Sequence, residues 1–146
     1  MATLEITGFE ELAEAYLRII DIPWPVMEKS LDEMAEAGLQ AIKSQGESMG
    51  VRDPESNVHI LDSLKRRKAK KTDSGGYEDV AFSGSRLRHE GGKRTPNAVI
   101  AFENEYGNRK QIARPFVDLG LNRQDDEIME GADAILDWVE EEFNQD

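Results

Sequence analysis

Hydrophobic positions recur at helical spacing in three segments of the chain. In residues 9–20 they fall three or four apart, which predicts a short amphipathic helix. A longer helix is predicted over residues 25–48, because one apolar stripe runs along it: Met27, Leu31, Met34, Ala35, Gly38 and Ile42. A third helix is predicted to open at Arg114-Pro115, with Gly120 as a point where it could restart. Its stripe consists of Ile128, Ala132, Ile135, Val139 and Phe143.

Strand-like segments lie between the second and third helices. Residues 77–82 and 98–102 are short and apolar, and the second is the clearest strand in the sequence. Two strands alone make a marginal sheet, so we expect either an extra strand near residues 65–72 or completion by a neighbouring copy. Residues 60–64 predict a helical turn.

This order of elements predicts a single α+β domain over residues 1–146. N-terminal helices and a C-terminal helix would pack on a small antiparallel sheet. Polar stretches rich in glycine predict flexible loops near residues 50–57 and 83–95.

The charge changes sign twice along the chain, whose net charge is -12. Residues 1–49 carry 3 basic and 10 acidic residues, residues 50–124 carry 15 and 10, and residues 125–146 carry 10 acids and no base. The densest basic run is Lys65, Arg66, Arg67, Lys68, Lys70 and Lys71. This layout suits self-association of complementary surfaces or a basic segment aimed at an anion, although charge runs are most often solvated surface.

Candidate catalytic and metal-binding sets are weak. The absence of cysteine excludes disulfides and thiolate zinc sites. His59 and His89 lack the spacing of zinc ligands. Glu103 and Glu105 could form a carboxylate pair, but one outward acid and one turn-bonded acid is the favoured interpretation. We therefore expect no enzyme, cofactor or metal; a small hydrolase or metal enzyme joining these acids to a histidine is the least favoured alternative.

The most specific stretch is residues 98–117, AVIAFENEYGNRKQIARPFV. Gly107 permits a positive φ and therefore a sharp turn. Pro115 presets the first turn of the following helix, and Phe116 is placed to anchor that helix on the sheet. Arg114 is predicted to pair with Glu103 or Glu105 across the turn, or with a carboxylate of the next subunit.

Three short motifs carry a family resemblance: Leu61-Asp-Ser-Leu64, Glu105-Tyr106-Gly107 and Ala113-Arg114-Pro115-Phe116. With the strand and helices around them, they resemble the small head–tail joining, or tail-completion (neck), proteins of long-tailed phages and prophages. The backbone preferences of Gly107 and Pro115 predict that the two later motifs form a corner of the fold. The resemblance spans about residues 26–143. It implies a non-enzymatic virion structural protein that assembles as a ring, expected to be a hexamer, at the head–tail junction or tail end.

The resemblance also implies a set of partners. These are further copies of the chain and the connector, head-completion, tail-tube or terminator proteins of the virion. The basic run and Arg114 are candidates for contact with another subunit or for nonspecific contact with DNA in the channel. No membrane contact is expected. The protein would lie in the virion, and in the host cytoplasm during assembly.

A nucleic-acid-binding accessory protein is the alternative function. Six cations in residues 65–71 could neutralise several phosphates. The run has no interleaved aromatic residue to stack on bases, and the whole chain is acidic.

Overall fold

The computed structural model describes residues 21–51, 60–88 and 90–145. Its helices are α2 (Trp24–Ser48), the 3-10 helix η1 (Ile60–Ser63), α3 (Asn97–Tyr106), α4 (Phe116–Arg123), α5 (Asp125–Glu130) and α6 (Asp133–Phe143). Its strands are β1 (Leu64–Arg66), β2 (Lys70–Thr72), β3 (Gly75–Tyr77), β4 (Val80–Phe82), β5 (Ser85–Leu87) and β6 (Arg94–Pro96). The α+β class predicted from the sequence is confirmed. The helix predicted over residues 9–20 lies outside the described residues.

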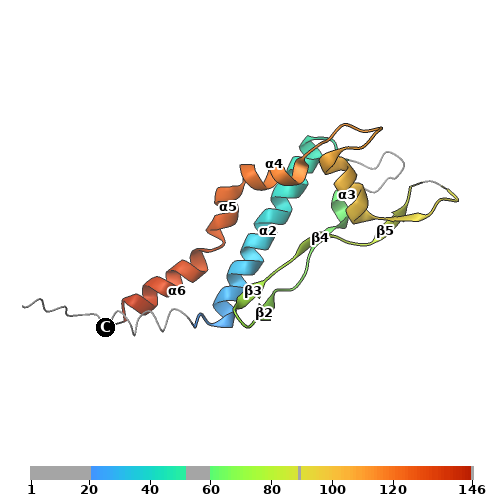
Figure 1. The fold of residues 1–146 in the computed structure, drawn as a ribbon. Coiled ribbons are helices and arrows are strands. Elements are labelled where there is room, and N and C mark those ends of the chain that lie inside the picture. Colours follow the sequence, from blue (N-terminus) through green and yellow to red (C-terminus); the bar gives the residue numbers. More distant parts are fainter. Residues whose placement is uncertain (1–20, 52–59, 89, 146) are drawn as a thin grey trace, which may run out of the picture.

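Helix α2 forms the long axis of the structure (Figure 1). Helices α4, α5 and α6 run back along one side of α2, and the strands from β1 to β4 lie along another side (Figure 1). The predicted stripe faces this packing, since Ala35, Gly38 and Ile42 are buried. Gly46 lies inside α2, and Gly50, with a φ of 69°, follows the end of the helix.

The strands form two-stranded antiparallel sheets. Strand β1 pairs with β4, and β2 pairs with β3. The backbone N–H of Arg67 donates to the carbonyl of Asp79 at 2.8 Å, so these pairs continue as one long hairpin. The extra strand expected near residues 65–72 is therefore present as β1 and β2, and the strand predicted over residues 77–82 is divided into β3 and β4.

A second hairpin replaces the loop predicted over residues 83–95. Strand β5 pairs with β6, with Ser85 opposite Pro96 and Leu87 opposite Arg94. The prediction of a loop was wrong, because these strands are held by backbone hydrogen bonds and their mostly polar side chains show no apolar strand pattern. The guanidinium of Arg94 also donates to Ser85 Oγ at 3.0 Å, and Gly91 turns with a φ of 77°.

The strand predicted over residues 98–102 is wrong, because this segment lies within α3. Its buried residues recur at i, i+3, i+4, i+7 and i+8, which is helical spacing: Asn97, Ile100, Ala101, Asn104 and Glu105. Three of these five are polar, so the hydrophobic pattern showed only a short apolar run. Such a run does not distinguish a strand from a buried helix.

The core gathers at the C-terminal half of α2. Its buried residues come from α2, η1, α3 and α4 and their flanks: Leu39, Ile42, Val51, Ile60, Leu61, Leu64, Ile100, Ala101 and Phe116. No residue of α5 or α6 is buried. The C-terminal helix breaks at Gln124 and Gly131 rather than at Gly120, which is buried within α4. Across the described ranges, no helix is long and apolar enough to cross a membrane.

Candidate functional site

Glu105 caps the start of helix α4. Its carboxylate accepts the backbone N–H of Val117 at 2.8 Å and that of Asp118 at 3.1 Å. No side chain at the N-cap position of α4 satisfies these groups. The first N–H groups of a helix have no partner within the helix and attract negative charge. Glu105 is 8% exposed, and it joins α3 to α4 by this contact.

Gly107 makes the turn between the two helices. Its φ of 76° and ψ of 175° belong to a region that is almost restricted to glycine. A Cβ there would lie 2.8 Å from the backbone nitrogen of Ala113 and 2.9 Å from the carbonyl oxygen of Gln111. The returning chain is fixed by the N–H of Arg114, which donates to the carbonyl of Asn104 at 2.6 Å. The turn predicted at Gly107 is present, but it joins two helices.

Phe116 anchors α4 after this turn. Its side chain is completely buried, and its ring meets that of Phe82 in β4 edge to face, with centroids 6.0 Å apart. It also lies against α2, since a Cβ on Gly46 would come within 3.1 Å of the Phe116 ring. The structure thus places Phe116 against the strands, as the sequence predicts, and against α2 as well.

The predicted pairing of Arg114 with Glu103 or Glu105 is wrong. Glu103 pairs with Arg88, with a distance of 2.8 Å from Nη1 to Oε2. Glu105 is committed to the α4 cap. Because this segment is a helix, the two glutamates project about 200° apart around it and do not share a face. Half-buried Arg114 forms no ion pair with any residue that the structure describes.

The aromatic residue of the motif lies on the surface. Tyr106 is 69% exposed and Phe102, one turn earlier, is 62% exposed. Their ring centroids are 4.7 Å apart. They border an apolar groove of about 360 Å³ between α3 and α4, whose lining includes Val117 and Leu121. The sequence gives no signal for Phe102, because an i, i+4 aromatic pair is recognisable only when the segment is treated as a helix.

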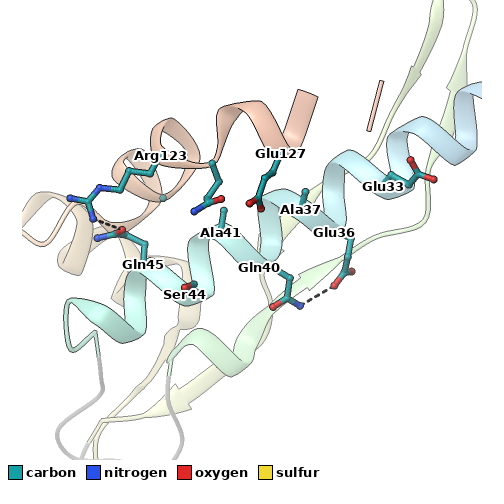
Figure 2. Close-up of a pocket in the computed structure, with 11 residues that line it drawn as sticks. Glu33, Glu36, Ala37, Gln40, Ala41, Ser44, Gln45, Arg123 and Glu127 are labelled. Carbon is teal, nitrogen blue, oxygen red and sulfur yellow. Dashed lines mark hydrogen bonds between the residues drawn. The ribbon is translucent and has the colours of Figure 1, made fainter. Parts of the chain in front are cut away.

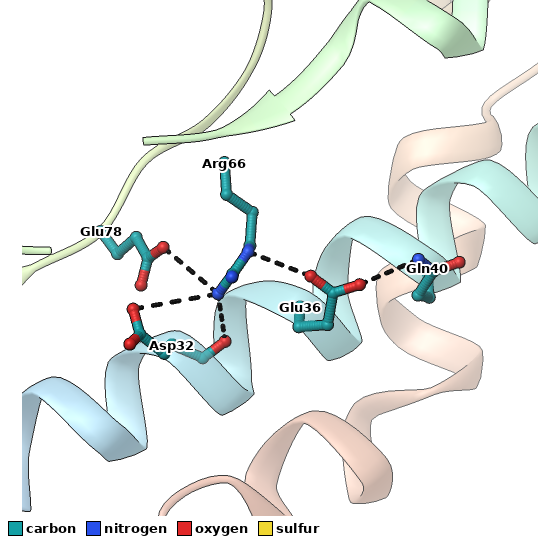
Figure 3. Close-up of polar contacts among 5 residues, drawn as sticks. All are labelled: Asp32, Glu36, Gln40, Arg66 and Glu78. Carbon is teal, nitrogen blue, oxygen red and sulfur yellow. Dashed lines mark hydrogen bonds and ion pairs between the residues drawn. The ribbon is translucent and has the colours of Figure 1, made fainter. Parts of the chain in front are cut away.

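Arg66 is the one member of the basic run held by a network of acids among the described residues. Its guanidinium lies 3.0 Å from Glu36 Oε2, 3.4 Å from Glu78 Oε1 and 3.9 Å from Asp32 Oδ1, and it donates to the Asp32 carbonyl at 2.7 Å (Figure 3). These contacts attach the hairpin to α2. Burial raises the pKa of Glu78, the neighbouring carboxyl of Asp32 raises it further, and Arg66 opposes both effects.

The other five cations of the run face solvent. They are Lys65, Arg67, Lys68, Lys70 and Lys71, and none forms an ion pair within the described part of the chain. The hairpin register places Tyr77, 44% exposed, opposite Lys70. The predicted basic segment is therefore an exposed surface, apart from Arg66.

A groove of about 630 Å³, lined by both polar and apolar groups, runs between α2 and the α4–α5 segment (Figure 2). Three carboxylates line it, those of Glu33, Glu36 and Glu127. At one end Arg123 Nη1 donates to Gln45 Oε1 at 3.0 Å. Neither His59 nor His89 belongs to the described residues, and within those residues no group of three or more His, Asp or Glu is placed to hold a metal ion. The groove therefore offers hydrogen-bonding groups and negative charge.

Comparisons with protein-family models, with curated proteins and with solved structures give no match to this chain.

Proposed function

We propose that this protein is a non-enzymatic virion structural protein that assembles as a ring at the head–tail junction or tail end. There it helps to complete the tail or to join it to the capsid. The observation that carries the proposal is the exposed Phe102–Tyr106 pair beside an apolar groove. Tyr106 belongs to the Glu105-Tyr106-Gly107 motif that resembles the neck proteins, and Phe102 lies one helical turn before it. Large contiguous exposed apolar patches mark surfaces that bind other proteins, and this pair extends the apolar lining of the groove.

The members of the motif divide into two groups, which supports the proposal. Glu105, Gly107 and Phe116 are committed to building the α3–α4 corner. Tyr106 contributes little to that corner, because most of its surface faces solvent. Aromatic residues are enriched at protein–protein interfaces, so a buried frame that presents an exposed aromatic side chain supports an interface role.

The proposed partners follow from this assembly. Copies of the chain would form a ring, expected to be a hexamer, and the ring would contact connector, head-completion, tail-tube or terminator proteins. Nonspecific contact with DNA in the channel belongs to the same proposal. The protein would occur in the virion, and in the host cytoplasm while particles form.

The test is particle assembly without the protein and with defined variants. Particles that lack it should consist of filled heads and separate tails, visible by electron microscopy. The double variant Phe102→Ser/Tyr106→Ser should fold but fail to restore joining, because both side chains are exposed. Leu87→Ser is the matched control, since Leu87 is 48% exposed in β5, outside the groove lining. Normal joining in the absence of the protein contradicts the proposal.

A nucleic-acid-binding accessory protein is the second candidate, and one feature of the hairpin favours it. The register brings an exposed aromatic ring, Tyr77, next to Lys70, which the linear sequence did not reveal. Basic side chains beside an aromatic ring suit single-stranded nucleic acid. A gel-shift titration at increasing salt tests it: binding should weaken steeply with salt and disappear when the five exposed cations become Ala. No binding at low salt removes this candidate.

A further inference from the structure

Helices α5 and α6 present a strongly acidic surface whose carboxylates have no ion-pair partner among the residues that the structure describes. Their acids are Asp125, Asp126, Glu127, Glu130, Asp133, Asp137, Glu140, Glu141 and Glu142, and the two helices contain no base. Negative charge at the C-terminal end of α6 also opposes the helix dipole. A basic surface laid against α6 would relieve both effects.

The same helices leave apolar side chains uncovered. Leu136 is 57% exposed, Met129 is 53% exposed and Phe143 is 41% exposed. This surface therefore combines carboxylates with apolar patches. Lysine and arginine side chains suit such a surface, because their methylene stems cover apolar groups while their charged ends reach the acids.

The complementary surface lies on the hairpin of the same chain. Five cations on β1, β2 and the residues between them are exposed and without an ion-pair partner among the described residues: Lys65, Arg67, Lys68, Lys70 and Lys71. Arg66 is excluded, because Asp32, Glu36 and Glu78 already neutralise it.

The two surfaces are separated within one molecule by helix α2. Helices α5 and α6 pack along one side of α2 and the hairpin packs along another (Figure 1). An α-helix with its side chains is about 10–12 Å across, which exceeds the Debye length of about 8 Å at physiological salt. The charges of one surface are therefore poorly placed to neutralise those of the other in the same chain.

We propose that the five exposed cations on β1, β2 and the residues between them dock on the α5–α6 surface of a second copy of this chain. The contact is head-to-tail, so each copy uses its hairpin on one neighbour and its acidic helices on the other. Repetition of such a contact gives a ring when the rotation closes. The inference rests on the proposed ring and names the surfaces that build it.

Two charge-neutralised variants of the full chain test the contact. The hairpin variant carries Lys68→Gln, Lys70→Gln and Lys71→Gln. The helix variant carries Asp137→Asn, Glu140→Gln and Glu141→Gln, which lie on one face of α6 at i, i+3 and i+4. All six positions are exposed and outside any described ion pair, so both variants should keep the wild-type far-ultraviolet circular dichroism. The hairpin variant should keep the wild-type melting temperature, and the helix variant should melt no lower than the wild type, because it loses negative charge near the C-terminal end of α6.

Mass in solution, measured by sedimentation velocity at low and high salt, is the readout. The wild type should form species larger than a dimer at low salt, and added salt should dissociate them. Each variant alone should associate at least about tenfold more weakly, since three charge pairs are lost. A mixture of the two variants should form a one-to-one pair that does not grow, because one intact hairpin then meets one intact helix surface.

Three results would overturn the inference. They are a wild type that stays monomeric at low salt, variants that associate like the wild type, and a mixture that gains nothing over its components. If the hairpin variant loses binding to a short single-stranded DNA while the wild type is monomeric, the cations serve nucleic acid instead. Failure of this contact is distinct from failure of the proposed function, because the function is read from head–tail joining. Joining that requires the protein while no self-association occurs would remove the contact alone.

Discussion

The two halves of α2 are packed in different ways. Its C-terminal half lies in the core, where Leu39 and Ile42 are buried with Phe116 of α4. Its N-terminal half lies between α6, which has no buried residue, and the β2–β3 hairpin, all of whose residues are half-buried or exposed. Trp24 is half-buried there and packs against Gly76 of β3.

The two halves therefore have different roles: one supplies most of the stability of the fold, and the other carries exposed charged surfaces. Apolar burial supplies most of the favourable free energy of folding, so the C-terminal half of α2 and the α3–α4 corner should dominate stability. The opposite half carries the opposed acidic and basic surfaces, whose exposed charges contribute little to folding. Such charges remain available to other molecules. Four predictions test this separation.

Phe116→Ala should have the largest effect. The side chain is completely buried and touches both Phe82 and the α2 backbone region at Gly46, so its loss leaves a cavity. We expect the free energy of unfolding to fall by about 3–5 kcal/mol. Urea denaturation measures it. Leu136→Ala on α6 is the control and should change the value by less than about 0.5 kcal/mol. Equal losses in the two variants would contradict the separation.

Gly107→Ala should have the next largest effect. The new Cβ would clash with the backbone at Ala113 and Gln111 while the residue kept a φ of 76°. We expect a loss of about 3 kcal/mol in the same denaturation experiment. Gly50→Ala provides the matched control, since Gly50 also has a positive φ but no atom within 4 Å of the new Cβ. Its loss should stay near 1 kcal/mol, and a similar loss in both variants would show that the close approach at Gly107 is unimportant.

Glu105→Gln should have a smaller effect. The amide keeps one acceptor oxygen but loses the charge and the second acceptor for the N–H groups of α4. We expect a loss of about 1 kcal/mol, typical of a weakened N-cap. Glu141→Gln removes the same charge from an exposed position on α6 and should be neutral within about 0.5 kcal/mol. A neutral result for Glu105→Gln would mean that the cap is dispensable.

Glu78→Gln should alter the pH dependence of stability rather than stability at one pH. Burial and Asp32 raise the pKa of Glu78 in the folded protein above its ordinary value of 4.5. Between the unfolded and the folded pKa of Glu78, the folded state binds more protons than the unfolded state. The contribution of Glu78 to the free energy of unfolding therefore falls as pH rises through this interval. The wild type should therefore lose stability relative to the variant over this interval. The free energy of unfolding of both proteins, measured by urea denaturation at several pH values in this interval, checks the prediction. An equal dependence on pH in the two proteins would contradict the raised pKa of Glu78.

The order of residues along the chain was sufficient to predict α2, the turn at Gly107 and the start of α4. The stripe from Met27 to Ile42 specified α2 almost to the residue, because a long periodic segment has one consistent amphipathic solution. Gly107 and Pro115 specified the turn and the start of α4 through their backbone preferences. The uneven distribution of acids and bases was likewise readable without coordinates.

Other features were decided by tertiary contacts. Helix α3 buries Asn104 and Glu105, whose partners come from elsewhere: Gln111 donates to the Asn104 side chain, and the N-terminus of α4 binds Glu105. A sequence shows polar residues but not the partners that permit their burial, so the helix was mistaken for a strand. The same cause separated Glu105 from Arg114 and left Tyr106 on the surface. By itself the sequence determined where the chain is periodic, where it turns and how its charge is distributed, since these depend on neighbouring residues. Only the tertiary structure decided which polar groups are satisfied inside and which surfaces remain free, because those depend on segments far apart in the chain.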